Sequence, residues 1–350
     1  MSTQLGTGKH VLLTGASGFI AAWVLKELLD QGYTVRATVR SAEKQAAIAK
    51  VYSNQVAAGK ITFAIVPDIA VPGAHDDAVK PSEGGAGLDF VIHTASPFHM
   101  NVTEPKSQML DPAVQGTRGL LEAFRITSSF ASILHPDRLS PPWPGKTYTE
   151  EDWNPITWEA ASKPGDPAST YRGSKTFAER AAWDFVRDAK PNFDLVTVCP
   201  PMVFGPVIND QTVAALNTSN QRVYGYLSGQ LKEIAPTGVH LWIDVRDLAV
   251  AHVAPLSVPE AGGQRFFTLA DEIYTNQDIC DILRKNFPEI KDRVPEGKPG
   301  SGLGLAPGEY FVGDNSKSKK ILGLKYRNLE ESIVDTAKTI LELEKKGSSA

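Results

Sequence analysis

The sequence predicts an α/β protein, with a doubly wound parallel sheet of the Rossmann type and a smaller C-terminal substrate lobe. Over the first 100 residues, short apolar runs with strand character alternate with segments of helical apolar spacing. The first run ends in the glycine-containing turn TGASGFIA, which opens a helical segment. The length of 350 residues suits one large α/β domain, or a nucleotide-binding domain with a smaller lobe.

The bounds of the expected strands and helices follow from where strand-like apolar runs and helical apolar spacing begin and end. Strands are expected over residues 10–14, 33–38, 61–66, 88–93, 125–129 and 193–199. Helices are expected over residues 19–29, 42–51, 109–124 and 168–188. Right-handed crossovers would place every strand's C-terminal end on one side of the sheet, which is where ligands bind in such folds.

The pattern loosens after Pro200, where short helices mix with Gly/Pro-rich loops. We therefore expect residues 1–200 to form the Rossmann-type domain, with residues 237–270 returning to it. Residues 201–236 and 271–343 are expected to form the substrate lobe and the C-terminal helices.

Composition excludes several classes of protein. The chain is 42% hydrophobic and 22% charged, with a net charge of −4 and no basic stripe, so we expect no nucleic-acid partner. No apolar run approaches the ~18 residues of a membrane span, and we expect no membrane partner. The two cysteines, Cys199 and Cys280, have no metal-site spacing, so no metal is expected. The N-terminus carries no apolar leader, which favours a cytoplasmic location.

The turn TGASGFIA has the features of a dinucleotide site. Gly15 permits the tight turn, and Gly18 lets the backbone approach a pyrophosphate at a helix N-terminus. Ser17, Phe19 and Ile20 lie in the same turn and are expected to contact the cofactor. The alternative is an ordinary glycine-rich turn, because such motifs occur without function.

The second predicted strand ends without the acid that holds the ribose 2′-hydroxyl in NAD enzymes. Residues 36–42 contain no Asp or Glu, and Glu43 is the first carboxylate after them. Arg40 and Lys44 are instead placed to meet a 2′-phosphate, so NADP(H) is the expected cofactor. The alternative is a solvated basic patch.

The segment YRGSK supplies a candidate acid. Tyr171 and Lys175 share a helix face because they are four residues apart. A free tyrosine, with a pKa of about 10, is a poor acid–base group, and a neighbouring ammonium is expected to lower that pKa. The alternative is an exposed tyrosine beside a surface lysine. ITSSFAS ends the fifth predicted strand and offers a hydroxyl for a substrate carbonyl.

The order TGASGFIA, HTASPF, ITSSFAS, YRGSK, CPPMVFGP resembles the extended short-chain dehydrogenase/reductases. Within them, residues 9–341 are most similar to the fungal methylglyoxal and aldehyde/ketone reductases, relatives of plant dihydroflavonol and cinnamoyl-CoA reductases. The resemblance implies NADPH-dependent reduction of a small-molecule carbonyl, with hydride delivered from the pro-S face. It also implies a triad of Ser129, Tyr171 and Lys175, whereas Ser128 and Ser132 do not match the catalytic serine.

The same resemblance implies further contacts. The expected cofactor contacts are Asp68 and Ile69 on the adenine side, Thr94, Ala95 and Ser96 after the fourth strand, and Pro200 and Val203 beside the nicotinamide. The candidate substrate contacts are Phe98, Phe130, Met202 and Tyr226. The expected assembly is a monomer or homodimer.

Two departures from the family pattern stand out. The family's helper asparagine would fall at Ala113, which puts a proton relay through that position in doubt. The connection from Glu122 to Ile126 is short. Either a loop is deleted there, or residues are missing from the chain.

Three other functions compete with reduction. A nucleotide-sugar dehydratase needs an acid pair after the serine, where this chain has Phe130 and Ala131. A sugar epimerase would hold NAD tightly, against which the missing ribose carboxylate argues. A non-catalytic NADP-sensing protein tends to lose the tyrosine or the lysine, and this chain keeps both.

Overall fold

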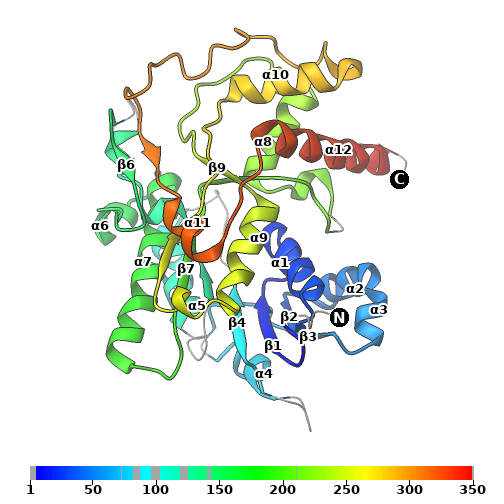
Figure 1. Cartoon of the computed structure of the whole chain (residues 1–350), viewed down its shortest axis with the longest axis vertical. Helices are drawn as coiled ribbons and strands as arrows, with labels where there is room; N and C mark the ends of the chain where they lie inside the picture. Colours follow the sequence, from blue (N-terminus) through cyan, green and yellow to red (C-terminus); the bar gives the residue numbers. More distant parts are fainter. Residues whose placement is uncertain are drawn as a thin grey trace.

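The computed structural model describes residues 5–71, 73–81, 87–95, 103–118, 125–139, 143–209 and 211–348. Within them, seven strands form one parallel sheet in the order β10-β7-β5-β4-β1-β2-β3. These strands are β1 (His10–Thr14), β2 (Thr34–Val39), β3 (Ile61–Ile65), β4 (Phe90–His93), β5 (Arg125–Thr127), β7 (Val196–Cys199) and β10 (Arg265–Phe267). The parallel, Rossmann-type α/β sheet is confirmed (Figure 1).

The helices are numbered in chain order. They are α1 (Phe19–Asp30), α2 (Ala42–Val51), α3 (Ser53–Ala57), α4 (Asp76–Val79), α5 (Asp111–Arg118), α6 (Trp158–Ala161), α7 (Pro167–Ala189), α8 (Thr218–Leu227), α9 (Val245–Val253), α10 (Asn276–Asn286), α11 (Ser316–Leu322) and α12 (Leu329–Ser348). A π-helical turn, Lys106–Leu110, leads into α5. Short 3-10 turns cover Phe130–Ser132, Pro136–Arg138, Val213–Ala215, Ala254–Leu256, Pro259–Ala261 and Pro288–Ile290.

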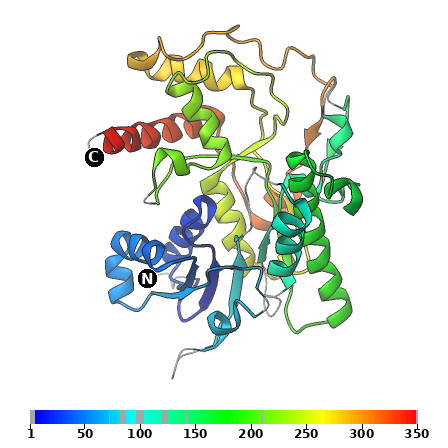
Figure 2. The same ribbon diagram turned by 180° about the vertical axis from the view of Figure 1, so that it is seen from behind.

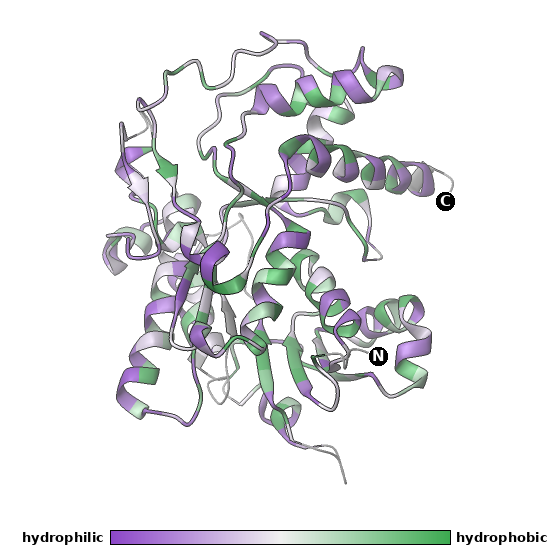
Figure 3. Cartoon of the chain, viewed as in Figure 1, coloured by the Kyte–Doolittle hydropathy of each residue, from purple (hydrophilic) through white to green (hydrophobic). Residues whose placement is uncertain are grey.

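Both faces of the sheet are covered, as a doubly wound fold requires. Along β1, Val11 and Leu13 join a core that includes residues of α1 and α9, while Leu12 joins a core with Ala182 of α7. Successive side chains of a strand point to opposite faces, so an apolar run such as β1 belongs inside two layers of helices. In Figure 3 the central strands are accordingly green, while α12 carries both colours.

The strand order places a topological switch point between β1 and β4. Both strands pair in parallel register, with Val11 opposite Phe90 and Thr14 opposite His93. The chain leaves β1 toward β2 on one side and β4 toward β5 on the other. Ligands of open α/β sheets bind in the crevice at such a point, beyond the strands' C-terminal ends.

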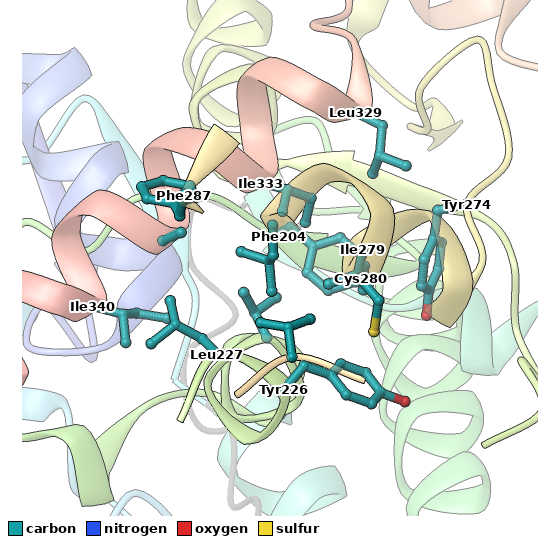
Figure 4. Close-up of a cluster of buried hydrophobic side chains, with 14 of the residues drawn as sticks. Phe204, Tyr226, Leu227, Tyr274, Ile279, Cys280, Phe287, Leu329, Ile333 and Ile340 are labelled. Carbon is teal, nitrogen blue, oxygen red and sulfur yellow. The ribbon is translucent and has the colours of Figure 1, made fainter. Parts of the chain in front are cut away.

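A separate apolar core lies among α8, α10 and α12, in the upper half of Figure 1 and in Figure 2 from behind. Phe204, Tyr226, Tyr274 and Ile333 are among its buried members, and Figure 4 shows them converging from different elements. The division of the chain at 200, 236 and 270 stays a prediction, and this core supports it. Helix α12 runs to Ser348, beyond the expected lobe boundary at 343.

Two small sheets connect this lobe to the rest, and two hydrogen bonds connect it to the region around α1. β8 (Met202–Phe204) pairs with β9 (Trp242–Asp244), and β6 (Thr147–Tyr148) pairs with β11 (Val312–Gly313). The Trp23 indole of α1 donates to the Pro206 carbonyl at 2.8 Å, and the Asn209 amide donates to the Ser17 carbonyl at 2.9 Å. The segment after β8 is therefore fastened to the start of α1.

No helix in the described part of the chain is both long enough and apolar enough to cross a bilayer.

Candidate active site

The glycine turn after β1 lies at the switch point and has room for a ligand backbone. Gly15 has a φ of +67°, and a Cβ there would lie 3.0 Å from the Ala95 Cα. Both the conformation and the close approach of the β4 turn require glycine. Gly18 caps α1 without a side chain, which leaves the helix N-terminus open toward the crevice. This cradle fits a dinucleotide pyrophosphate.

The turn after β4 is joined to β1 by a buried polar network. The Thr94 hydroxyl donates to the Thr14 carbonyl at 2.6 Å, and the Ala95 amide donates to the Thr14 hydroxyl at 3.2 Å. The His93 Nδ1 lies 2.8 Å from that same hydroxyl, and burial lowers the pKa of His93 to about 3. A neutral imidazole at this depth joins the ends of β4 and β1 through the Thr14 hydroxyl. Ser96 and Phe98 lie outside the described residues.

The basic residues predicted for a 2′-phosphate lie beside the glycine turn. Arg40 is exposed immediately after β2 ends. Lys44, in the first turn of α2, lines a cavity of about 250 Å³ together with Ser17 and Gly18. Of the two residues expected on the adenine side, Asp68 accepts a hydrogen bond from the Ala70 amide, and Ile69 packs against Gly116. These positions fit the adenosine half of NADPH.

Helix α7 carries the tyrosine and the lysine on one face. Asp166 caps the helix through the Ser169 amide at 3.0 Å, and proline occupies the first position. The Ser129 side chain lies close enough to Tyr171 to influence its pKa, and the Lys175 Nζ lies 5.9 Å from the centroid of the Tyr171 ring. The structure therefore brings all three residues of the predicted triad together.

The segment that carries Ser129 is an extension of the sheet. The Ser128 amide donates to Val198 and the Phe130 amide to Pro200, both at 2.8 Å. Ser129 is thus held between two backbone hydrogen bonds to β7 and its continuation. The same contact brings buried Pro200 beside the serine, where the resemblance expects the nicotinamide.

The expected substrate contacts divide into two groups. Met202 is half-buried at the margin of the lobe core, and the next residue, Val203, which is expected to contact the nicotinamide and not the substrate, is buried. Phe130 is 3% exposed and stacks on Phe267 at 5.1 Å between centroids, and Tyr226 is 1% exposed inside the lobe core (Figure 4). The Phe130 and Tyr226 rings both pack inside apolar cores, and this burial argues against the expected substrate contacts at these two residues.

Comparison with known proteins adds to this geometry. The NAD dependent epimerase/dehydratase family matches residues 11–270 of the chain. The chain belongs to this family. It is 42% identical to the ketoreductase azaE of Aspergillus niger over 347 residues, covering 95% of this chain and 98% of the relative. It is 37% identical to the NADPH-dependent methylglyoxal reductase GRE2 of Saccharomyces cerevisiae, with 95% and 98% covered.

Solved structures of the family extend the likeness. The crystal structure of yeast methylglyoxal/isovaleraldehyde reductase Gre2 complexed with NADPH superposes with a TM-score of 0.86 at 37% identity. It covers 96% of this chain and 99% of that one. Vestitone reductase from alfalfa, at 21% identity and a TM-score of 0.69, shares the fold.

The expected effect of the lysine on the tyrosine is wrong for this structure. Burial raises the pKa of Tyr171, and the hydrogen bond with Ser129 lowers it by less. Lys175 is itself desolvated, which lowers its pKa to about 8. Desolvation opposes the charged form of both groups, so Tyr171 keeps its proton at neutral pH. This is the form that a proton donor needs.

Ala113 stands where the family's helper asparagine would be, and its carbonyl accepts from the Thr117 hydroxyl at 2.9 Å. Ala113 also lines a cavity of about 20 Å³ together with Lys175, Ser128 and Glu179. A cavity of this size holds one water molecule. The short connection before Ile126 involves residues 119–124, which lie outside the described part of the chain.

Two further residues, Glu179 and Arg265, lie at this site and were not predicted from the sequence. Glu179 lies one turn beyond Lys175 on α7, and Arg265 reaches it from β10 at 2.7 Å. The signal for Glu179 was its spacing, since Tyr171, Lys175 and Glu179 continue one helix face. Nothing local marked Arg265 as its partner.

Proposed function

We propose that this protein is an NADPH-dependent reductase of aldehydes and ketones, with Tyr171 as proton donor. The observation that carries the proposal is the convergence of Ser129, Tyr171 and Lys175 at the switch point that holds the glycine turn. The names of the relatives support it, because they are a ketoreductase and an NADPH-dependent methylglyoxal reductase.

Each side chain has a separate part in this reaction. Ser129 donates a hydrogen bond to the substrate carbonyl oxygen and so fixes its direction. Tyr171 transfers its hydroxyl proton to the same oxygen as negative charge develops there. Lys175 stabilises the resulting phenolate, and it would also hold the nicotinamide ribose hydroxyls. When bound, NADPH supplies the hydride.

The rest of the cofactor would be held by residues on three turns. Gly15, Ser17, Gly18, Phe19 and Ile20 would hold the pyrophosphate, and Arg40 and Lys44 the 2′-phosphate. Asp68 and Ile69 would contact the adenine, and Thr94 and Ala95 would pass close to the cofactor. Pro200 and Val203 would lie against the nicotinamide.

We propose a broad substrate range of uncharged aliphatic, aryl and keto-ester carbonyls. Carbonyl reduction needs little beyond hydride geometry and a proton, so such a site can accept many shapes. The test is an initial-rate panel with NADPH over methylglyoxal, branched aldehydes, aryl ketones, keto esters and a dihydroflavonol. A single substrate leading in kcat/KM by more than about 10³ would contradict the broad range. The location, cytoplasmic, and the assembly, monomer or homodimer, stay predictions.

Arg40→Asp is expected to lower kcat/KM for NADPH by roughly 10²-fold and to leave that for NADH nearly unchanged. The substitution removes a charge-assisted contact to the 2′-phosphate and adds repulsion. Steady-state kinetics with each cofactor measures the change in kcat/KM for NADPH and for NADH separately. Lys50→Asp, on the exposed far end of α2, makes the same charge change as a control and should alter neither value. A wild-type enzyme with equal kcat/KM for NADH and NADPH would contradict the assignment of Arg40 and Lys44 to the 2′-phosphate.

The rate of reduction should also depend on pH through Lys175. Its pKa of about 8 means that the ammonium is present below that pH and is lost as pH rises through it. We expect kcat/KM to be level near neutrality and to fall above about pH 8. Initial rates at constant ionic strength, from about pH 6 to about pH 10, would show the break. A profile that stays level to the alkaline end would exclude an essential ammonium.

A further inference from the structure

A buried carboxylate lies directly behind the candidate triad. Glu179 follows Lys175 by one helical turn on α7, and its side chain is 1% exposed. Carboxylates are almost never buried to this degree unless they are paired. The groups that contact Glu179 therefore indicate its role.

Both carboxylate oxygens of Glu179 are fully engaged. The Ser128 hydroxyl donates to Oε2 at 2.5 Å, and the Ser132 hydroxyl lies 2.6 Å from the same oxygen. Oε1 accepts from the Thr197 hydroxyl at 2.8 Å and from the Arg265 Nε at 2.7 Å. Burial raises the pKa of Glu179, but the charge of Arg265 and these hydrogen bonds outweigh burial and hold the pKa below its ordinary value. The group is a satisfied buried anion.

Two of these partners are the serines on either side of the candidate catalytic serine. Ser128 precedes Ser129 directly, and the Ser132 hydroxyl lies 2.7 Å from the Ser129 carbonyl oxygen. The Ser128 and Ser132 hydroxyls can both reach the carboxylate only when the turn that carries Ser129 lies at a fixed distance from α7. The carboxylate thus fixes the serine turn against the same helix that carries Tyr171.

Arg265 of β10 contacts both the Glu179 carboxylate and the Ser132 hydroxyl and is itself held in place. Its Nη1 donates to the Glu150 carbonyl at 2.8 Å and to the Asp152 carbonyl at 2.5 Å. Its guanidinium lies 3.8 Å from the centroid of the Trp153 ring, and its Nη2 donates to the Ser132 hydroxyl at 2.9 Å. A planar, multidentate guanidinium allows little rotation in such a site.

We propose that Glu179 is a positioning residue for carbonyl reduction, which with Arg265 sets the distance between the Ser129 hydroxyl and Tyr171 by anchoring Ser128 and Ser132. This proposal rests on the proposed function. Loss of the anchor would move the serine hydroxyl relative to the tyrosine while leaving the glycine turn and Arg40 in place. The expected consequence is a lower kcat at an unchanged KM for NADPH.

The decisive variant removes the two hydroxyls and keeps the ion pair. For Ser128→Ala/Ser132→Ala we expect kcat to fall roughly 10- to 100-fold, the scale for small misplacement of a reacting group, with KM for NADPH within about twofold. The single variants each remove one anchor and should show part of the effect. They also provide the readout if the double variant fails to fold.

A charge series separates positioning from stability. Glu179→Gln leaves Arg265 buried without its counter-ion, so both Tm and kcat should fall. Glu179→Met/Arg265→Met removes both charges together with the carboxylate acceptor, and we expect Tm to recover from the Glu179→Gln value while kcat stays low, because the serines then lack their acceptor. Asp247→Asn weakens the ion pair between buried Asp247 of α9 and Arg327, which precedes α12, and serves as the control, lowering Tm with kcat unchanged.

The outcomes are distinct. An active wild type whose serine variants keep the wild-type kcat overturns the positioning role alone. Recovery of kcat together with Tm in the double charge variant does the same, since it would show a purely structural pair. A wild type inactive on every carbonyl of the panel overturns the proposed function and this proposal with it.

Discussion

Tyr171→Phe is expected to lower kcat by about 10³-fold or more, roughly 4 kcal/mol of transition-state stabilisation, while NADPH binds almost as before. The substitution keeps the ring and deletes only the hydroxyl, which lies near the Ser129 side chain. Because burial holds the proton on Tyr171 at neutral pH, no other change of charge accompanies it. Single-turnover rates would measure the chemical step, and quenching of protein fluorescence would measure the NADPH dissociation constant.

The matched control is Tyr326→Phe. Its hydroxyl lies 2.7 Å from the Ser318 hydroxyl in the connection between α11 and α12, remote from the serine turn. Loss of this hydrogen bond should cost about 1 kcal/mol of folding free energy and leave kcat unchanged. A Tyr171→Phe enzyme with near-normal kcat would assign the proton donor to another residue.

Lys175→Ala is expected to damage both steps, lowering kcat by about 10³-fold and raising KM for NADPH at least about 10-fold. The lysine would stabilise the phenolate and also hold the nicotinamide ribose, so its removal affects chemistry and cofactor binding together. Steady-state kinetics with NADPH varied at saturating carbonyl separates the two effects. The alkaline break near pH 8 should vanish from the residual activity, since the titrating group is gone.

Lys175→Met keeps most of the side-chain volume and distinguishes loss of charge from loss of packing. We expect it to resemble Lys175→Ala in kcat, and melting curves of both would verify the fold. A lysine variant that changes kcat alone, with KM for NADPH intact, would show that the ribose contact is absent.

The local part of the fold could be predicted because its signals are local. Helix α2 has the predicted bounds, Ala42–Val51, since Ser41 precedes it as a cap and Ile48 marks its inward face. The glycine turn was predictable for a similar reason. Only glycine tolerates the φ of +67° at Gly15, and the motif names the residue that must stand there.

Long-range pairings carried no such signal. The two-residue strands Thr147–Tyr148 and Val312–Gly313 pair across the chain, and neither is long enough to show a period. The burial of Phe130 was missed for a related reason. An aromatic residue beside a catalytic serine suggests a substrate contact, and only the fold brings Phe267 and Phe311 around it.

The candidate site shows the same division between local and distant information. Tyr171 and Lys175 lie on one helix, so their spacing predicted a shared face. Ser129 was assigned by resemblance, and the structure places it within hydrogen-bonding reach of Tyr171. Glu179 looked like one more helical carboxylate, because its partner Arg265 follows 86 residues later.

The two hydrogen bonds that fasten the segment after β8 to α1 have a consequence for protection against proteases. Asn209 is bonded to the Ser17 carbonyl, in the turn proposed for the pyrophosphate, and Pro206 to Trp23. A ligand that binds only the folded form of that turn stabilises it against local unfolding. The segment after β8 is stabilised as well, because it must separate from the turn when the turn unfolds. Occupancy by the cofactor would therefore shield a stretch of the substrate lobe that the cofactor itself need not touch, and digestion of that stretch would slow as the nucleotide concentration rises.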